Sequence, residues 1–257
     1  MYKHVALLVR QEGMSHEEFR EYWEENHSPL AKDIEGEENH SPLAKDIEGV
    51  VRYQTVYPTD PENAEFDGLA ELYFETIEDL HEALGSEGSR DYDPTREVAA
   101  EAREDVNNFL DVDQRPRFIG EEKVWKDEVS GNTNGLYKHS AFLVRQDGMS
   151  HEEFREYWED NHSPLAKDIE GVVRYQTVYP TDPENAEFDG VAELYFQMFE
   201  DLHEALGSEG SRDYDPTREV AAAAREDVDN FLDVDQRPRF IGEEKVWKNE
   251  TEDVEGY

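Results

Sequence analysis

Two histidines, His4 and His139, lie in the middle of short apolar segments of the sequence. Side chains of a β-strand alternate between two faces, so each ring would share its face with apolar neighbours. A buried imidazole costs free energy unless it is hydrogen-bonded, so we expect a partner for each. Glu71 and Glu193, in the middle of a later predicted strand, are the candidates. A His–Glu pair facing a cavity would be a general base; the alternatives are a satisfied core pair and a histidine at a sheet edge.

The sequence lacks the residues that most other catalytic chemistries require. The chain has no cysteine, which excludes disulfides, thiolate zinc sites, iron–sulfur clusters and a cysteine nucleophile. Histidine pairs with metal-ligand spacing, glycine-rich nucleotide loops and a serine-hydrolase elbow are also missing from the sequence. We therefore expect no metal and no cofactor, with haem as an alternative because any cavity histidine could ligate its iron. Four further histidines, on polar helix faces, should be solvated: His16, His81, His151 and His203.

The chain consists of two copies of one sequence. Tyr2–Lys126 recurs as Tyr137–Lys248 with ten differences, once a local duplication is removed. That duplication places EENHSPLAKDIEG twice in succession, at 24–36 and 37–49, where the second copy has the segment once. A repeat of this length is a duplicated domain rather than a solenoid. The predicted organisation is a first domain at 1–126, a linker at 127–136, a second domain at 137–248 and a tail at 249–257.

Each copy is predicted to fold in the order β-α-β-β-α-β. Period-two patterns predict strands at 2–10, 50–57, 69–74 and 117–125, and helical patterns predict helices after Ser15, near 78–84 and after Asp93. This order is that of a ferredoxin-like α+β sheet with helices on one face. The other face also carries apolar side chains, so we expect the two sheets to face each other. They would close an eight-stranded barrel with room for a small ligand.

The first predicted helix carries a family signature. Residues 14–23 read MSHEEFREYW, NHSPL follows at 26–30, and a glycine then precedes Arg52-Tyr53. This pattern resembles that of the EthD family, and the second copy repeats it. The resemblance covers nearly all of both copies and implies the dimeric α/β-barrel fold, here as tandem domains that form an intramolecular pseudo-dimer.

The resemblance also implies a histidine at the end of the first helix: His162 in the second copy, and His27 or its duplicate His40 in the first. Such a ring could transfer protons near neutral pH, or it could be structural, capping the helix or pairing with a carboxylate. Helix formation is local and starts at the N-terminal cap, so we expect His27 to match His162. Tyr53 and Tyr175 could add a hydroxyl to the cavity or serve only in strand packing.

The resemblance leaves the activity open. Relatives on this fold include cofactor-free cyclases, isomerases, dehydratases and monooxygenases, haem enzymes, and proteins without known activity. One hypothesis is a cofactor-independent enzyme that acts on a small organic substrate by His/Glu proton transfer. The other is a non-catalytic binding or accessory protein of an oxidative degradation system. A cavity with converging His and Glu would favour the enzyme, and a closed apolar core filled by Tyr and Phe would favour the binding protein.

The chain is strongly acidic, with 65 Asp and Glu against 25 Lys and Arg and a formal net charge of −40. Nucleic acids and anionic membranes bind basic surfaces, so neither is an expected partner. Concentrated salt shortens the Debye length and suppresses self-repulsion, so the charge predicts the cytoplasm of an extreme halophile. No transmembrane segment or secretory signal is expected. The predicted partner is a small organic molecule, and further homo-oligomerisation is left open.

Overall fold

The computed structural model describes residues 1–27, 46–85, 97–129, 134–207 and 217–251. The elements of the first copy are β1 (Tyr2–Leu8), α1 (His16–Tyr22), the π-helical turn η1 (Trp23–His27), β2 (Val50–Pro58), β3 (Gly68–Phe74), α2 (Ile77–Leu84), α3 (Glu97–Asp105), the 3-10 turns η3 (Val106–Asn108) and η4 (Val112–Gln114), and β4 (Arg117–Asp127). Those of the second copy are β5 (Tyr137–Leu143), α4 (His151–Tyr157), η5 (Trp158–His162), α5 (Ser163–Ala166), β6 (Val172–Pro180), β7 (Gly190–Phe196), α6 (Phe199–Leu206), α7 (Glu219–Asp227), η6 (Val228–Asn230), η7 (Val234–Gln236) and β8 (Arg239–Asn249).

These elements confirm the predicted α+β fold class. The first helix starts with the predicted capping box: the Ser15 hydroxyl accepts from the Glu18 amide, and the Glu18 carboxylate accepts from the Ser15 amide. Phe19 is the buried residue of α1. The predicted helix start at Asp93 and the duplicated segment through residue 45 lie outside the described residues.

The first helix of each copy ends in a π-helical turn that the sequence pattern did not predict. In η1 the wider turn buries both Trp23 and His27. The tryptophan packs against a glycine of the sheet: a Cβ atom at Gly68 would lie 2.4 Å from the Trp23 ring, and one at Gly190 would lie 2.4 Å from its counterpart Trp158. These close contacts fix the helix end, and with it the histidine that closes the turn.

The chain divides into two compact units that we call unit 1 and unit 2. Unit 1 comprises Met1–Val56, Pro61–Ile119 and Lys245–Tyr257, and unit 2 comprises Tyr57–Asp60 and Gly120–Glu244. The sheet order is β4-β1-β3-β2-β8 in unit 1 and β8-β5-β7-β6-β4 in unit 2. The first and last parts of β4 and β8 thus belong to different units, and the complete order of eight strands is a closed barrel. The predicted domain boundaries at 126 and 137 stay a prediction.

The exchanged strand ends are anchored by side chains. In unit 2, Lys123 of β4 donates to Glu159 of η5 at 2.6 Å, and Trp125 donates to Thr177 of β6 at 2.9 Å. In unit 1, β8 makes the equivalent contacts, including a 2.8 Å bond from its Lys245 to η1. Each copy's last strand therefore supports the helix end that carries the other copy's histidine.

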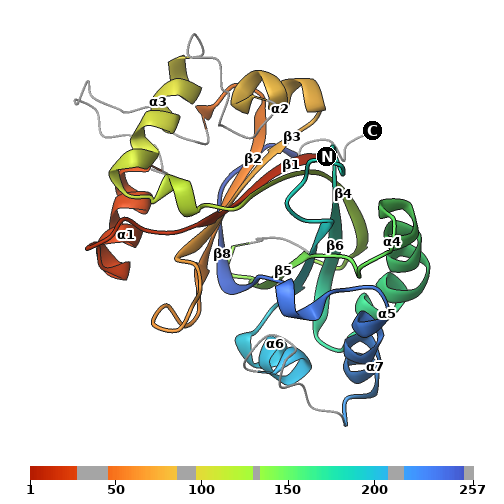
Figure 1. Ribbon diagram of the computed structural model, residues 1–257. Helices are drawn as coiled ribbons and strands as arrows, with labels where there is room; N and C mark the ends of the chain where they lie inside the picture. Colours follow the sequence, from red (N-terminus) through yellow and green to blue (C-terminus); the bar gives the residue numbers. More distant parts are fainter. Residues whose placement is uncertain (28–45, 86–96, 130–133, 208–216, 252–257) are drawn as a thin grey trace, which may run out of the picture. The chain divides into compact units, whose positions relative to one another are not determined.

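Helices cover one face of the sheet in each unit. In unit 1, Leu80 and Leu84 of α2 and Ala102 of α3 pack against Leu72 and Phe74 of β3; Figure 1 shows α2 and α3 beside strands β1 to β3. In unit 2 the corresponding apolar clusters join the sheet to α4, α6 and α7. The face beneath the helices is the one that holds the candidate site.

Candidate functional site

A small cavity lies between the sheet and the helices of unit 2. Its volume is about 60 Å³. Alanines from the sheet and from α5, α6 and α7 provide much of the wall, and their short side chains leave the space open. The polar side chains that reach it are His139 from β5, His162 from η5, Arg225 from α7, and Arg237, which follows η7. Two imidazoles and two guanidiniums thus converge on an otherwise apolar space.

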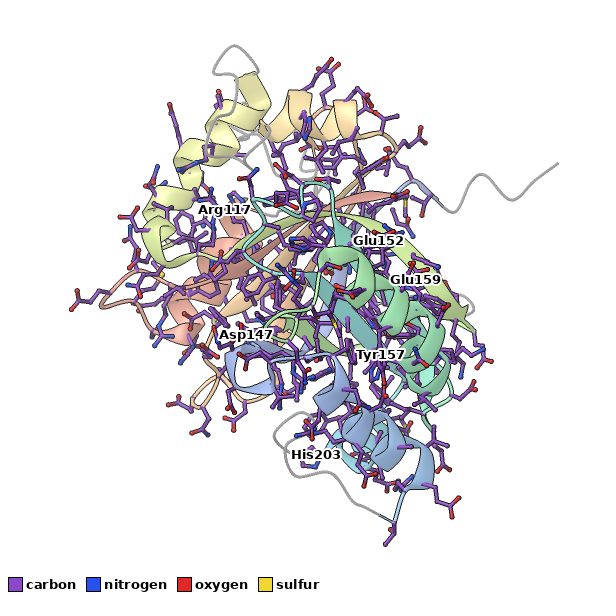
Figure 2. All side chains as sticks on the ribbon, turned by 45° about the vertical axis from the view of Figure 1, so that its right-hand side comes forward. Arg117, Asp147, Glu152, Tyr157, Glu159 and His203 are labelled. Atoms are coloured by element: carbon purple, nitrogen blue, oxygen red, sulfur yellow. The ribbon has the colours of Figure 1, made fainter. Side chains whose placement is uncertain are left out.

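His162 is held by a carboxylate at the end of α7. Its Nδ1 lies 3.0 Å from Asp227 Oδ2, and its ring packs on Phe231 with centroids 5.1 Å apart. Tyr157, on the α4–η5 stretch (Figure 2), donates its hydroxyl to Asp227 Oδ1 at 2.8 Å, and Asn230 donates to the same oxygen at 3.1 Å. The hydrogen bond from His162 lowers the pKa of Asp227 and outweighs burial, which raises it. Asp227 is therefore ionised and fixes the imidazole through Nδ1.

His139 lines the cavity without a side-chain hydrogen bond to the described residues. It is 4 % exposed, and neither ring nitrogen has a hydrogen-bond partner among the described residues. Burial, and then the positive charges of Arg237 and Arg239, lower its pKa to about 3. The ring is therefore neutral at physiological pH, with one N–H donor and one acceptor nitrogen unused.

Unit 1 contains the same site. His27 Nδ1 lies 2.8 Å from Asp105 Oδ2, the ring packs on Phe109 at 5.1 Å, and Tyr22 donates to Asp105 Oδ1 at 2.7 Å. The cavity, of about 70 Å³, is lined by His4, His27, Arg103 and Arg115 and by apolar side chains. These matching contacts confirm the prediction that His27 takes the place of His162. The duplicate His40 lies outside the described residues.

The predicted His–Glu pairs are wrong. In the strand register His4 lies opposite Leu72 and His139 opposite Leu194, so the glutamates one residue earlier point to the other face of the sheet. There Glu71 forms an ion pair with Lys3 at 2.6 Å, and Glu193 forms one with Lys138 at 2.8 Å.

All four side chains of these ion pairs are fully buried. Gln176 donates to Glu193 at 2.5 Å and adds to the pair in unit 2. The two glutamates therefore belong to polar clusters of the core and do not contact the histidines of the cavities.

The two tyrosines differ in their relation to the cavities. Tyr53 lines the unit 1 cavity, and Tyr175 is not among the residues that line the cavity of unit 2. The Tyr175 hydroxyl accepts a 3.1 Å hydrogen bond from Trp158 Nε1 and lies 3.3 Å from Ser163 Oγ. Burial raises its pKa to about 12, so this hydroxyl stays protonated and locks the helix end to the sheet. A substrate-binding role for either tyrosine stays a prediction.

The remaining histidines divide into two groups. His81 and His203 are exposed, as predicted. His16 and His151 are instead partly buried, with Nδ1 atoms 2.9 Å from Asp67 and 3.0 Å from Asp189. The prediction of solvation was wrong for this second group because a loop aspartate reaches back to the helix start.

Several residues of the site were missed from sequence: the aspartates that hold the histidines, and the arginines of the cavity walls. The strongest available signal was the AREDV stretch that ends the last long helix of both copies, which sets Arg225 and Asp227 two residues apart at the end of α7. Because the chain has 65 acidic residues, sequence alone does not single out this carboxylate.

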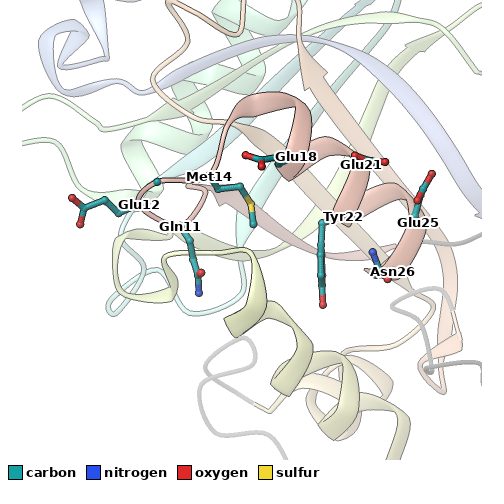
Figure 3. Close-up of a pocket in the computed structure, with 9 residues that line it drawn as sticks. Gln11, Glu12, Met14, Glu18, Glu21, Tyr22, Glu25 and Asn26 are labelled. Carbon is teal, nitrogen blue, oxygen red and sulfur yellow. The ribbon is translucent and has the colours of Figure 1, made fainter.

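A larger hollow, of about 580 Å³, opens on the surface beside α1 (Figure 3). Its wall includes Glu12, Glu18, Glu21 and Glu25, with the Tyr22 ring between them. Acidic side chains cover much of this chain's surface. No group of three or more histidine or carboxylate side chains among the described residues could hold a metal ion.

Comparison with known proteins agrees with this architecture. The family model of the EthD domain matches residues 11–113 and 146–235. The chain belongs to the EthD family. The two matched segments correspond to the two copies, and each includes the helix-end histidine and the aspartate that holds it. No curated protein matches the sequence. None of the described helices is long and apolar enough to cross a membrane.

Solved structures share the fold of this EthD protein at low sequence identity. An anthrone oxidase-like protein is 11 % identical with a TM-score of 0.56, covering 97 % of this chain and 94 % of its own. A Lactobacillus acidophilus protein provisionally named a monooxygenase is 12 % identical with a TM-score of 0.52 and coverages of 97 % and 96 %. A variant chlorite dismutase from Candidatus Nitrospira defluvii is 10 % identical with a TM-score of 0.50 and coverages of 95 % and 90 %. At these identities the likeness establishes the fold alone.

Proposed function

We propose that this EthD protein is a cofactor-independent enzyme that transfers protons on a small, mainly apolar organic molecule, with one active site in each unit. The observation that carries the proposal is the His162–Asp227 pair at the wall of an apolar cavity, repeated as His27–Asp105. Two converging histidines, rather than a filled core, favour an enzyme over a binding protein.

The contacts of His162 support its assignment as the catalytic base. Asp227 accepts from Nδ1–H of His162, which fixes the tautomer and leaves the Nε2 lone pair for the cavity. Nε2 makes no hydrogen bond to the described residues, so it is free to take a proton from a substrate. The nearby carboxylate stabilises the imidazolium that forms, and the same ring can return the proton to another atom. A positioned base of this kind contributes about 10²–10⁴-fold to a reaction rate.

The cavity volumes help to choose between a cofactor-free enzyme, a haem protein and an accessory binding protein. Pockets for drug-sized ligands measure about 300–1,000 Å³, and the two cavities measure about 60 and 70 Å³. A haem group does not fit in either. The same sizes favour substrates of a few heavy atoms. The role of an accessory binding protein has no observation here that favours it over catalysis.

Hydrogen–deuterium exchange tests the proposal without knowledge of the full reaction. The full chain is incubated in D2O with small ketones, lactones and 2-oxo acids, and deuterium incorporation at carbon is followed by NMR. We expect at least one compound to exchange faster with the wild-type chain than with the His27→Gln/His162→Gln double variant. The matched control, His81→Gln/His203→Gln, alters two exposed histidines and should behave as wild type. Compounds that bind without enzyme-dependent exchange would instead indicate a binding protein.

We infer in addition that the protein works in concentrated salt. The support is the net charge of −40, which opposes compaction unless counterions screen it. This inference concerns the solvent and is independent of the proposed reaction.

A further inference from the structure

The polar lining of both cavities is positive or neutral. In unit 2 it consists of His139, His162, Arg225 and Arg237, and in unit 1 the equivalent four residues recur. Among the residues that the structure describes, no aspartate or glutamate lines either cavity. In a chain with 65 acidic residues, two cavities with arginines and no described carboxylate in their walls form local exceptions to the overall charge.

His139 adds a second, independent observation. It is an imidazole more than nine-tenths buried that lines the cavity and has no hydrogen-bond partner among the described residues. An unsatisfied buried polar group lowers stability, and such groups mark functional sites when a ligand supplies the missing bond. The ring offers an N–H donor to whatever enters.

Arg237 supplies the charge beside this donor. Its side chain is 6 % exposed and lines the same cavity. Its positive charge contributes to keeping His139 unprotonated, and the same field attracts a negative group on a ligand. In this low-dielectric space a positive charge interacts more strongly with an anion than it would in water.

We propose that each cavity holds a negatively charged oxygen of its ligand, bound by Arg237 and His139 in unit 2 and by Arg115 and His4 in unit 1. Two sources share this chemistry. The oxygen could belong to a carboxylate that the substrate carries, or to an enolate that forms when the base removes a proton. The enolate source rests on the proposed function, and the carboxylate source does not.

The enolate step balances without a co-reactant. Nε2 of His162 takes the proton from a carbon next to a carbonyl group, and the C–H bonding pair forms a C=C bond. The carbonyl π electrons move to oxygen, which becomes the anion facing Arg237 and the N–H of His139. Return of the proton to carbon reverses the step or completes an isomerisation. Donors placed where charge develops are the usual means of lowering such a barrier.

Three small probes, of which the first two are matched in size, separate the two sources. Acetate carries a carboxylate, acetamide is its neutral counterpart, and 2,4-pentanedione forms an enolate with its own ultraviolet absorption. Each is titrated into the full chain at pH 7.5 and one fixed KCl concentration, with binding followed by the NMR signals of the histidine rings. The chain's net charge disfavours acetate non-specifically, so a preference for acetate would have to come from a local site.

A carboxylate site predicts that acetate binds at least tenfold more tightly than acetamide. An enolate site predicts no such preference, but enolate absorption from bound 2,4-pentanedione. Either effect should disappear in Arg115→Met/Arg237→Met, and also in His4→Leu/His139→Leu, which serves if the arginine variant does not fold. His81→Gln/His203→Gln should leave both effects unchanged.

The proposal is overturned if wild type shows neither effect, or if either effect survives both double variants. The deuterium-exchange experiment tests the proposed function separately. An acetate preference without deuterium exchange would leave the anion site standing and reject the enzyme. Deuterium exchange without either anion effect would reject the anion site and leave the proposed enzyme standing.

Discussion

The buried ring of His139 should make the stability of unit 2 depend on pH by a calculable amount. Its pKa is about 3 in the folded chain, against an ordinary value of 6.5. Between these values the unfolded chain binds a proton that the folded chain does not, so the free energy of unfolding falls as the pH falls from 6.5 towards 3. Each pKa unit corresponds to about 1.4 kcal/mol, so the loss from pH 7.5 to pH 5.0 is about 2 kcal/mol.

The variant His139→Leu removes this contribution and leaves other titrating groups in place. Urea unfolding of wild type and variant at pH 7.5 and 5.0, in constant KCl, measures the difference. Wild type should lose about 2 kcal/mol more than the variant on acidification. At pH 7.5 the variant should be more stable by about 1–3 kcal/mol, because an unsatisfied polar group is replaced by an apolar one of similar size.

The exposed His203 provides the matched control, since His203→Gln should keep the pH dependence of wild type. Equal losses for wild type and His139→Leu would show that the folded ring accepts a proton, and the reasoning about an isolated neutral imidazole would be wrong. A large loss of stability in His139→Leu at pH 7.5 would show that the ring has a partner in solution.

Three further outcomes follow from the packing and the charge. Lys138→Met or Glu193→Gln alone should each cost about 3–5 kcal/mol because one buried charge is left unpaired, whereas the double variant should be near neutral in urea unfolding; additive costs would contradict this. Gly190→Ala should cost about 1–3 kcal/mol or more, since its Cβ would lie 2.4 Å from the Trp158 ring, and an unchanged midpoint would show that the indole can move. The melting temperature should be higher in 3 M than in 0.1 M KCl, because the Debye length is about fivefold shorter and self-repulsion is suppressed; an equal or lower value would refute the halophilic interpretation.

The fold could be predicted from sequence because its signals are local. The capping box of Ser15 and Glu18, the helical stripe and the period-two strands each determine an element without reference to distant residues. The repeat then doubles the pattern. The exchanged ends of β4 and β8 were not predicted, because strand neighbours depend on contacts across the whole chain.

The candidate site was predicted only in part, for a geometric reason. Alternation within a strand shows that His4 and Val5 point to opposite faces, and the same holds for Glu71 and Leu72. Which face of one strand matches which face of the next depends on the register, and a shift of one residue exchanges them. The His–Glu hypothesis assumed the wrong match. Asp105, 78 positions after His27, has no local signal that pairs it with the ring.

The ten differences between the copies sharpen the case for two working sites. None of the ten positions lines either cavity. Val5 and Ser140, for example, lie on the opposite face of the sheet, beside the buried ion pairs. The histidines, arginines and aspartates of the two sites are the same in both copies, with Nδ1–carboxylate distances of 2.8 and 3.0 Å. The 13-residue duplication lies within residues 24–49 of the first copy, yet the contact between His27 and Asp105 is kept. A ligand would therefore meet the same base and the same positive wall in either unit, so single-site substitutions should halve an activity that only paired substitutions abolish.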